Sequence, residues 1–188
     1  MRAMLTHSRN PVAVALRGGR WPFVTRPCGY SGVVKVDVVI EIPRGSRNKY
    51  EWDERRRVMR FDRSVAGAVA FPADYGFIPQ TCSDDGDPLD ALVLLDEPTF
   101  PGIWVLTRPV GVCWTDAGKY QEPKIICVPV NDPSYTRVRD LGDLPDVVRD
   151  EIQQFFNVYK DFDDGHDSRF MRFDDHNAAK AVIRNSRT

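Results

Sequence analysis

The chain of 188 residues is long enough for one folded domain with a full hydrophobic core, and its 42% hydrophobic and 28% charged residues are typical of soluble globular proteins. The formal net charge is only −1, but all 27 acidic residues lie after Val36, together with 20 of the 26 basic residues. This acidic body argues against a nucleic-acid partner, and no apolar run approaches the roughly 18 residues of a membrane helix.

Residues 1–35 contain basic side chains, scattered Gly and Pro, and no Asp or Glu. They lack the continuous apolar segment of a secretory signal. We expect a flexible N-terminal extension, followed by a domain over residues 36–188, in a cytoplasmic protein. The four cysteines form no CxxC pair, which agrees with reduced thiols. An organellar transit peptide is the alternative, although Ser is sparse in this segment.

Short segments with strand character follow. In each of them β-branched or aromatic residues alternate with polar ones or form a short apolar run, and Gly, Pro or Asp separates them. The predicted strands cover residues 33–42, 49–53, 57–63, 91–95, 103–114 and 124–130. Together they indicate a mainly β domain built as a closed or nearly closed antiparallel barrel.

Two helices are predicted after these strands. The first has Asp143 as its N-cap and Pro145 in its first turn, and it runs to residue 161. Its apolar residues at helical spacing are Val148, Ile152, Phe155, Phe156 and Tyr159. They form one face that can cover the barrel. A shorter helix is predicted over residues 174–185.

An acidic loop, DDGDPLD over residues 84–90, precedes the apolar run 91–95. Carboxylates this close repel one another unless a cation compensates them. Asp85 and Asp87 flank a single glycine, so both side chains point to one side of an extended chain, and Asp90 follows where the strand begins. Mg²⁺ binds such oxygen clusters together with water and phosphate. A solvated acidic turn explains the loop equally well when it is taken alone.

Further polar residues stand before and after this loop. They are, in chain order, Glu41, Lys49, Glu51, Arg63, Tyr75, Asp116, Glu122, Lys124, Tyr159 and Lys160. A single Lys, Arg or Tyr is usually a solvated surface group. Gathered around the acidic loop, however, the set supplies carboxylates for metal ions and cations for a phosphate-containing substrate.

The segments that carry these residues resemble the soluble inorganic pyrophosphatases of the Mg²⁺-dependent barrel family, family I. The matching pieces are VVIEIPRGSRNKYE, FDR, FPADYGFIP, DGDPLDALVLL, RPVGV, DLGDLP and FFNVYKD, which span about residues 36–180. The resemblance implies an OB-like five-stranded closed β-barrel packed by two or three helices. It also implies hydrolysis of pyrophosphate to two phosphates, several Mg²⁺ ions per site (or other divalent ions such as Mn²⁺), and a homo-oligomer, most often a hexamer.

The same resemblance implies roles for individual residues. The implied metal ligands are Asp85, Asp90 and Glu122, with Glu41 and Asp87 facing metal or water and Glu51 in support. The implied phosphate ligands are Lys49, Arg63, Tyr75, Lys124, Tyr159 and Lys160, and the first three of these also count as catalytic. We predict that Asp87 is the general base for a water activated between metal ions.

Two positions depart from the family pattern. Relatives carry two acidic residues five apart before the lysine that corresponds to Lys124, whereas Asp116 and Glu122 are six apart. Asp116 reaches the metal site only through a one-residue bulge. Phe71 replaces a tyrosine of many bacterial relatives. We expect activity, with weaker binding of a second metal ion or an altered metal preference.

Two other functions stay open. One is a catalytically weakened relative that binds phosphate or metal without turnover, because of the changed loop 115–123. The other is an OB-type barrel that binds single-stranded nucleic acid, since residues 44–63 interleave basic side chains with Tyr50, Trp52 and Phe61. The acidic body disfavours the latter. We therefore expect pyrophosphate as substrate, and neither nucleic acid nor membrane as partner.

Overall fold

The computed structural model describes residues 34–116, 118, 120–159 and 169–188. Almost all of the expected N-terminal extension therefore lies outside the described residues, as does Lys160, and the domain boundary near residue 36 stays a prediction. Within the described ranges, no helix combines the length and the apolar character needed to span a membrane.

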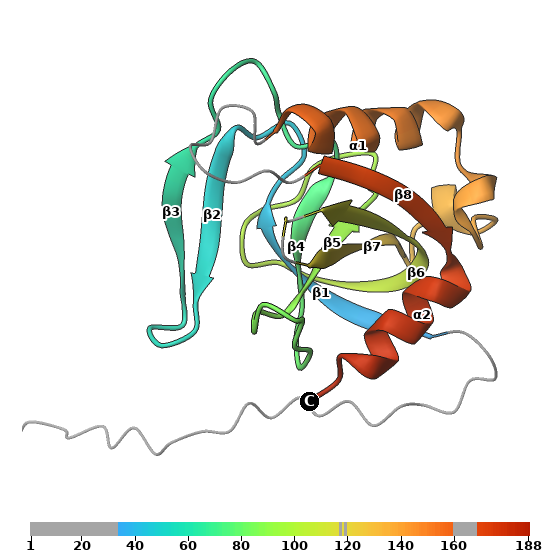
Figure 1. Cartoon of the computed structure of the whole chain (residues 1–188), viewed down its shortest axis with the longest axis horizontal. Helices are drawn as coiled ribbons and strands as arrows, with labels where there is room; N and C mark the ends of the chain where they lie inside the picture. The colour runs from blue at the N-terminus through green and yellow to red at the C-terminus, as the bar shows by residue number, and fades with distance from the viewer. Residues whose placement is uncertain (1–33, 117, 119, 160–168) are drawn as a thin grey trace, which may run out of the picture. The chain divides into compact units, whose positions relative to one another are not determined.

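Five strands close into a barrel (Figure 1). They are β1 (Val36–Ile42), β4 (Asp74–Ile78), β5 (Leu89–Val93), β6 (Trp104–Asp116) and β7 (Gln121–Pro129). Their order is β1-β4-β5-β7-β6, and pairing of β1 with β6 closes the ring. Outside the ring, β8 (Arg169–Asp175) pairs with β6, and β2 (Asn48–Asp53) forms a separate hairpin with β3 (Val58–Ser64). The predicted five-stranded closed barrel is confirmed.

The strand pattern predicted a fully antiparallel barrel, and this prediction is wrong for one pair of strands. β5 and β7 run parallel, with Asp90 opposite Lys124, while the other four pairs of the ring are antiparallel. A closed ring with an odd number of strands cannot alternate direction at every step, so at least one pair must be parallel. Closure therefore requires a parallel pair somewhere in the ring, and the alternation within single strands cannot reveal it.

Two strands, β4 and β8, lack a strand prediction. β4 has only five residues and contains Gly76, which weakens its strand pattern. A Cβ at Gly76 would lie 1.9 Å from the Val39 carbonyl oxygen, so only glycine allows β4 to approach β1 this closely. β8 is rich in charges, and its Phe170 and Phe173 rings contact each other at 4.7 Å between centroids. β8 ends at Asp175, so the predicted helix over residues 174–185 is wrong for its first two residues.

Two helices cover the barrel, α1 (Asp146–Val158) and α2 (His176–Asn185). The predicted apolar face of α1 is confirmed, because Ile152, Phe155 and Phe156 are buried. Asp143 is not its N-cap. Pro145 takes that position, and Asp143 closes the 3-10 helix η2 (Leu141–Asp143), which follows η1 (Pro133–Tyr135). In Figure 1, α1 lies across the top of the barrel and α2 lies beside β6.

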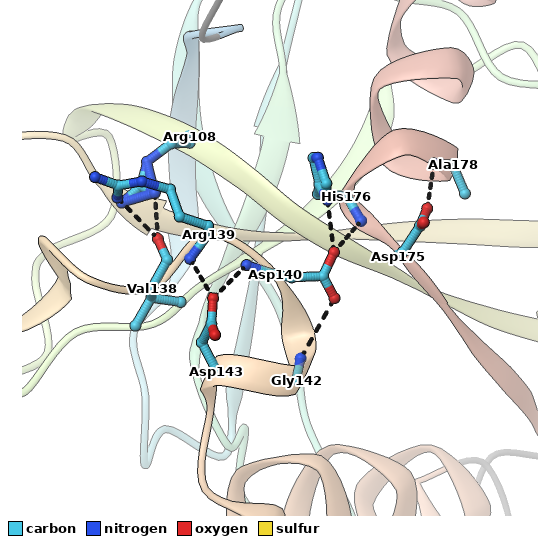
Figure 2. A network of polar contacts seen from close by, with 9 residues as sticks. All are labelled: Arg108, Val138, Arg139, Asp140, Gly142, Asp143, Asp175, His176 and Ala178. Carbon is cyan, nitrogen blue, oxygen red and sulfur yellow. Dashed lines mark hydrogen bonds and ion pairs between the residues drawn. The ribbon is translucent and has the colours of Figure 1, made fainter.

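A polar network joins η2 to the start of α2 (Figure 2). Asp140 accepts hydrogen bonds from the backbone N–H groups of Gly142 and His176, and its Oδ2 lies 2.6 Å from His176 Nδ1. Burial raises the pKa of Asp140, but the hydrogen bonds from His176 outweigh it and lower the pKa. Asp175 caps α2 by accepting from the N–H of Ala178 at 2.9 Å. The network fixes the segment before α1 to α2.

Candidate active site

A cavity of about 470 Å³ gathers most of the predicted site residues. The predicted residues that line it are Glu41, Lys49, Glu51, Tyr75, Asp85, Asp87, Asp90, Glu122, Lys124 and Tyr159. They come from β1, β2, β4, β5, β7, the acidic loop and the end of α1. The volume suits a small ligand, and the lining combines acidic with cationic groups. These residues, far apart in the sequence, therefore form one site in space.

Lys124 lies between two carboxylates at the base of this site. The parallel register places it opposite Asp90, and its Nζ pairs with Asp90 and, at 2.8 Å, with Glu122 Oε2. The Lys124 side chain is only 8% exposed. Burial lowers its pKa, but the charges of Asp90 and Glu122 outweigh burial and raise the pKa above its usual range. The buried ammonium therefore stays charged.

The acidic loop turns sharply at Gly86, whose φ is +92°. No atom lies within 4 Å of a Cβ built there, so the left-handed backbone, and not crowding, requires glycine. The N–H of Asp87 donates to Asp85 Oδ1 at 2.9 Å. Burial, and then the charges of Asp85 and Asp90, raise the pKa of Asp87. These aspartates face the cavity and repel one another.

Glu41 extends the acidic lining from β1. It accepts a hydrogen bond from the N–H of Trp52 at 2.7 Å. Burial, supported by the charges of Asp90 and Glu51, outweighs this bond and raises the pKa of Glu41 from 4.5 to about 7. Nearby, Lys49 Nζ lies 2.6 Å from Glu51 Oε1. Burial opposes the charge on Lys49, but the hydrogen bond to Glu51 outweighs it, so the Lys49 pKa is raised.

Aromatic rings form another wall of the cavity. The Phe71 ring lies 5.4 Å from Tyr75 and 5.7 Å from Tyr159 between centroids, and Phe155 stacks on Tyr159 at 4.9 Å. Desolvation, followed by the charge of Asp90 and a hydrogen bond to it, raises the pKa of Tyr75 well above its usual value. The Tyr75 hydroxyl therefore stays protonated and donates its hydrogen bond to Asp90. Buried Phe71 contributes only an apolar ring.

Two described residues of the predicted set, Arg63 and Asp116, do not belong to the cavity lining. Arg63 lies opposite Lys49 in the hairpin, and its guanidinium pairs with Asp62. Asp116 ends β6, where the register with β7 is regular from Gly111 to Asp116, so the expected bulge is absent from this pairing. Strand alternation then directs Asp116 to the face opposite Glu122, and Asp116 accepts from the N–H of Gly118 at 2.8 Å. Lys160 lies outside the described residues.

The comparison with protein families agrees with this geometry. The sequence model of the family described as "Inorganic pyrophosphatase" matches residues 38–188. The chain belongs to the inorganic pyrophosphatase family. The resemblance stated from the sequence motifs is therefore confirmed, and the match covers both helices and all of the barrel except the first two residues of β1.

Individual inorganic pyrophosphatases are similar over most of their length. The one from Synechocystis sp. is 47% identical over 128 residues, which cover 68% of this chain and 76% of that protein. The one from Leifsonia xyli subsp. xyli is 49% identical over 129 residues, covering 69% and 79%. The crystal structure of inorganic pyrophosphatase from Thermus thermophilus has a TM-score of 0.80 at 40% identity, covering 86% of this chain and 94% of that one.

Some cavity residues of this inorganic pyrophosphatase fold were not predicted. The backbone N–H of Trp52 donates a hydrogen bond to Glu41, and a motif of side chains cannot predict such a backbone contact. Glu54 lines the cavity from the segment after β2, where the charged run DERRR reads as a solvated turn. The helical apolar spacing correctly placed Phe155 and Phe156 on the barrel side, but that spacing does not distinguish a core residue from a residue that also lines a cavity.

Proposed function

We propose that this chain is an inorganic diphosphatase that hydrolyses pyrophosphate to two phosphates in this cavity. One observation carries the proposal: the acidic loop residues Asp85, Asp87 and Asp90 share a single cavity with the ammonium groups of Lys49 and Lys124. Pyrophosphate hydrolysis requires both, because a polyanion must be neutralised and a water must lose a proton. Membership of the inorganic pyrophosphatase family supports it.

The donor set of the cavity fits hard divalent ions. Among the described residues that line it, every candidate ligand is a carboxylate oxygen, and neither Cys nor His takes part. We propose several Mg²⁺ ions, with Mn²⁺ as a substitute. The proposed ligands are Asp85, Asp90 and Glu122, with Glu41 and Asp87 beside them and Glu51 in support. Bound Mg²⁺ neutralises substrate charge and makes water more acidic.

The chain's own groups divide the remaining work. Asp87 accepts the proton of the attacking water, since it lies at the turn of the loop and its pKa is raised toward the range of a useful base. Lys49 and Lys124 hold phosphate oxygens as point charges. Tyr75 and Tyr159 add neutral hydrogen-bond donors at the aromatic wall. Arg63, beside Lys49, and Lys160 keep their proposed phosphate-binding roles.

Two further properties belong to this proposal. We expect a homo-oligomer, with a hexamer as the first candidate, on the strength of the family resemblance. We also expect a cytoplasmic location, which is supported by the free, buried thiols of Cys113 and Cys127.

Phosphate release from pyrophosphate, measured with and without Mg²⁺, tests the proposed function. We expect Mg²⁺-dependent turnover that the Asp87→Asn substitution reduces. Pyrophosphate binding without turnover identifies the weakened relative, for which the displaced Asp116 is the structural reason. Oligonucleotide binding that falls steeply with salt, in the absence of turnover, identifies the nucleic-acid-binding alternative instead.

A further inference from the structure

We propose that Thr81 is a positioning residue that holds the acidic loop in the shape needed to bind metal ions. The proposal rests on the proposed function, because it assigns Thr81 a task in the same site. Thr81 does not line the cavity. It therefore acts through the loop between the end of β4 at Ile78 and the start of β5 at Leu89.

The Thr81 hydroxyl ties the two ends of this loop together. Its Oγ1 donates to the Ile78 carbonyl at 2.6 Å and accepts from the Leu89 N–H at 2.9 Å. Thr81 is only 7% exposed and Leu89 is fully buried, so water cannot readily replace the lost hydroxyl. The hydroxyl thus adds a link at Ile78 and Leu89, the last pair of the β4–β5 ladder, and holds the base of the loop that contains Asp85 and Asp87.

The backbone around Thr81 is anchored from a second direction. Thr81 forms a β-bridge with Arg187, the N–H of Cys82 donates to the Ser186 carbonyl at 2.7 Å, and the N–H of Thr188 donates to the Gln80 carbonyl at 3.3 Å. Gln80 has a φ of +61°, a left-handed conformation that costs a non-glycine residue about 1–2 kcal/mol. Such a conformation persists where surrounding contacts determine it.

Backbone hydrogen bonds extend this constraint from the base of the loop to the backbone of Asp87. The N–H of Ser83 donates to the Asp87 carbonyl at 2.7 Å, and the N–H of Gly86 donates to the Ser83 carbonyl at 3.0 Å. The aspartates repel one another, so an untied loop spreads them apart in the absence of metal. A tied loop avoids that reorganisation when ions bind, and residues that orient metal ligands are typically worth about 10- to 100-fold in metal affinity.

The test is Mg²⁺ binding to the full-length chain, measured by isothermal titration calorimetry with Mg²⁺ alone. We expect Thr81→Val, which keeps the branched shape and removes the hydroxyl, to weaken Mg²⁺ binding about 10- to 100-fold. We expect Thr81→Ser, which keeps the hydroxyl, to bind within about threefold of the wild type. Saturating Mg²⁺ should restore most of the phosphate release of Thr81→Val, because the groups that touch substrate are unchanged.

Thr107→Val is the matched control. Thr107 is fully buried, and its Oγ1 donates to the Val36 carbonyl at 3.0 Å, between β6 and β1 and outside the cavity lining. It should lose comparable stability and keep its Mg²⁺ affinity. Unchanged affinity in Thr81→Val, or an equal loss in Thr107→Val, overturns the positioning role.

Two further outcomes separate this inference from the proposed function. If Thr81→Val does not fold, Thr81→Cys, whose thiol is a weak donor and acceptor, decides in the same titration, and wild-type affinity there overturns the inference. A wild-type chain that binds Mg²⁺ but releases no phosphate refutes the proposed function alone, and the titration still decides on Thr81. A wild-type chain that binds no Mg²⁺ overturns both.

Discussion

Replacing Lys124 by methionine removes a buried ammonium and leaves Asp90 and Glu122 facing each other. At the 2.8 Å separation of Lys124 and Glu122, and an effective dielectric constant of about 20, their attraction is about 6 kcal/mol. Desolvation of the ammonium offsets part of it, and removal of one partner of a buried pair typically costs about 3–5 kcal/mol. Because native proteins are stable by only about 5–15 kcal/mol, the variant should be markedly destabilised.

Divalent ions should reverse part of this loss. In Lys124→Met both carboxylates lack their cation, so Mg²⁺ binds them without competition from an ammonium. An ion present at about 100 times its Kd adds about 2.7 kcal/mol of stability. We therefore expect Mg²⁺ to stabilise Lys124→Met more than it stabilises the wild type, while phosphate release stays low because a phosphate ligand is missing.

Urea unfolding followed by tryptophan fluorescence measures both effects, in EDTA and in Mg²⁺, at one fixed protein concentration. Lys180→Met is the matched control, since Lys180 on α2 lies outside the cavity lining. The reasoning fails if Lys124→Met unfolds in EDTA within about 1 kcal/mol of the wild type. It also fails if Mg²⁺ stabilises both chains equally.

Three other predictions follow from the same geometry. Asp87→Asn should lower kcat about 10²- to 10⁴-fold at saturating Mg²⁺ with an unchanged unfolding transition; unaltered turnover would remove Asp87 as the base. In EDTA, protonated Glu41 contributes stability that is fully present below pH 4.5 and lost as the pH rises through about 7, in total about 3 kcal/mol. Urea unfolding at pH 5 and pH 8 should show this loss, and Glu41→Gln should abolish it. Asp74→Ala should cost about 3 kcal/mol in thermal or urea unfolding, because buried Asp74 accepts from the N–H groups of Arg44 and Thr99; a cost below about 1 kcal/mol contradicts this.

Local patterns were sufficient for the elements whose residues repeat a clear period. The alternation in β1 and the helical spacing of Ile152, Phe155 and Phe156 both follow from burial of one face, and the structure buries them. β4 was not predicted as a strand because it contains Gly76. This glycine allows close contact with β1, which a local sequence pattern does not reveal. The need for a parallel pair, found here between β5 and β7, follows from closure of the ring, which is a property of all five strands together.

The site residues likewise fall into those that local sequence predicts and those that depend on the tertiary structure. Side chains with distinctive chemistry, such as Asp85 and Lys124, were found from the sequence and lie in one cavity. Asp116 shows the limit of that approach, because the direction of its side chain depends on the β6–β7 register. Thr81 and Trp52 act through a hydroxyl and a backbone N–H, which look ordinary in any sequence.

The regular register of β6 and β7 has an evolutionary consequence. Glu122 and Lys124 are held by pairing with Thr115 and Cys113 within the two strands, and β6 ends only at Asp116. Insertions and deletions in the hairpin tip that follows can accumulate across a lineage while the Asp90–Lys124 pair keeps its place. The buried ion pair at the centre of the site therefore depends on strand pairing and not on the length of this hairpin tip.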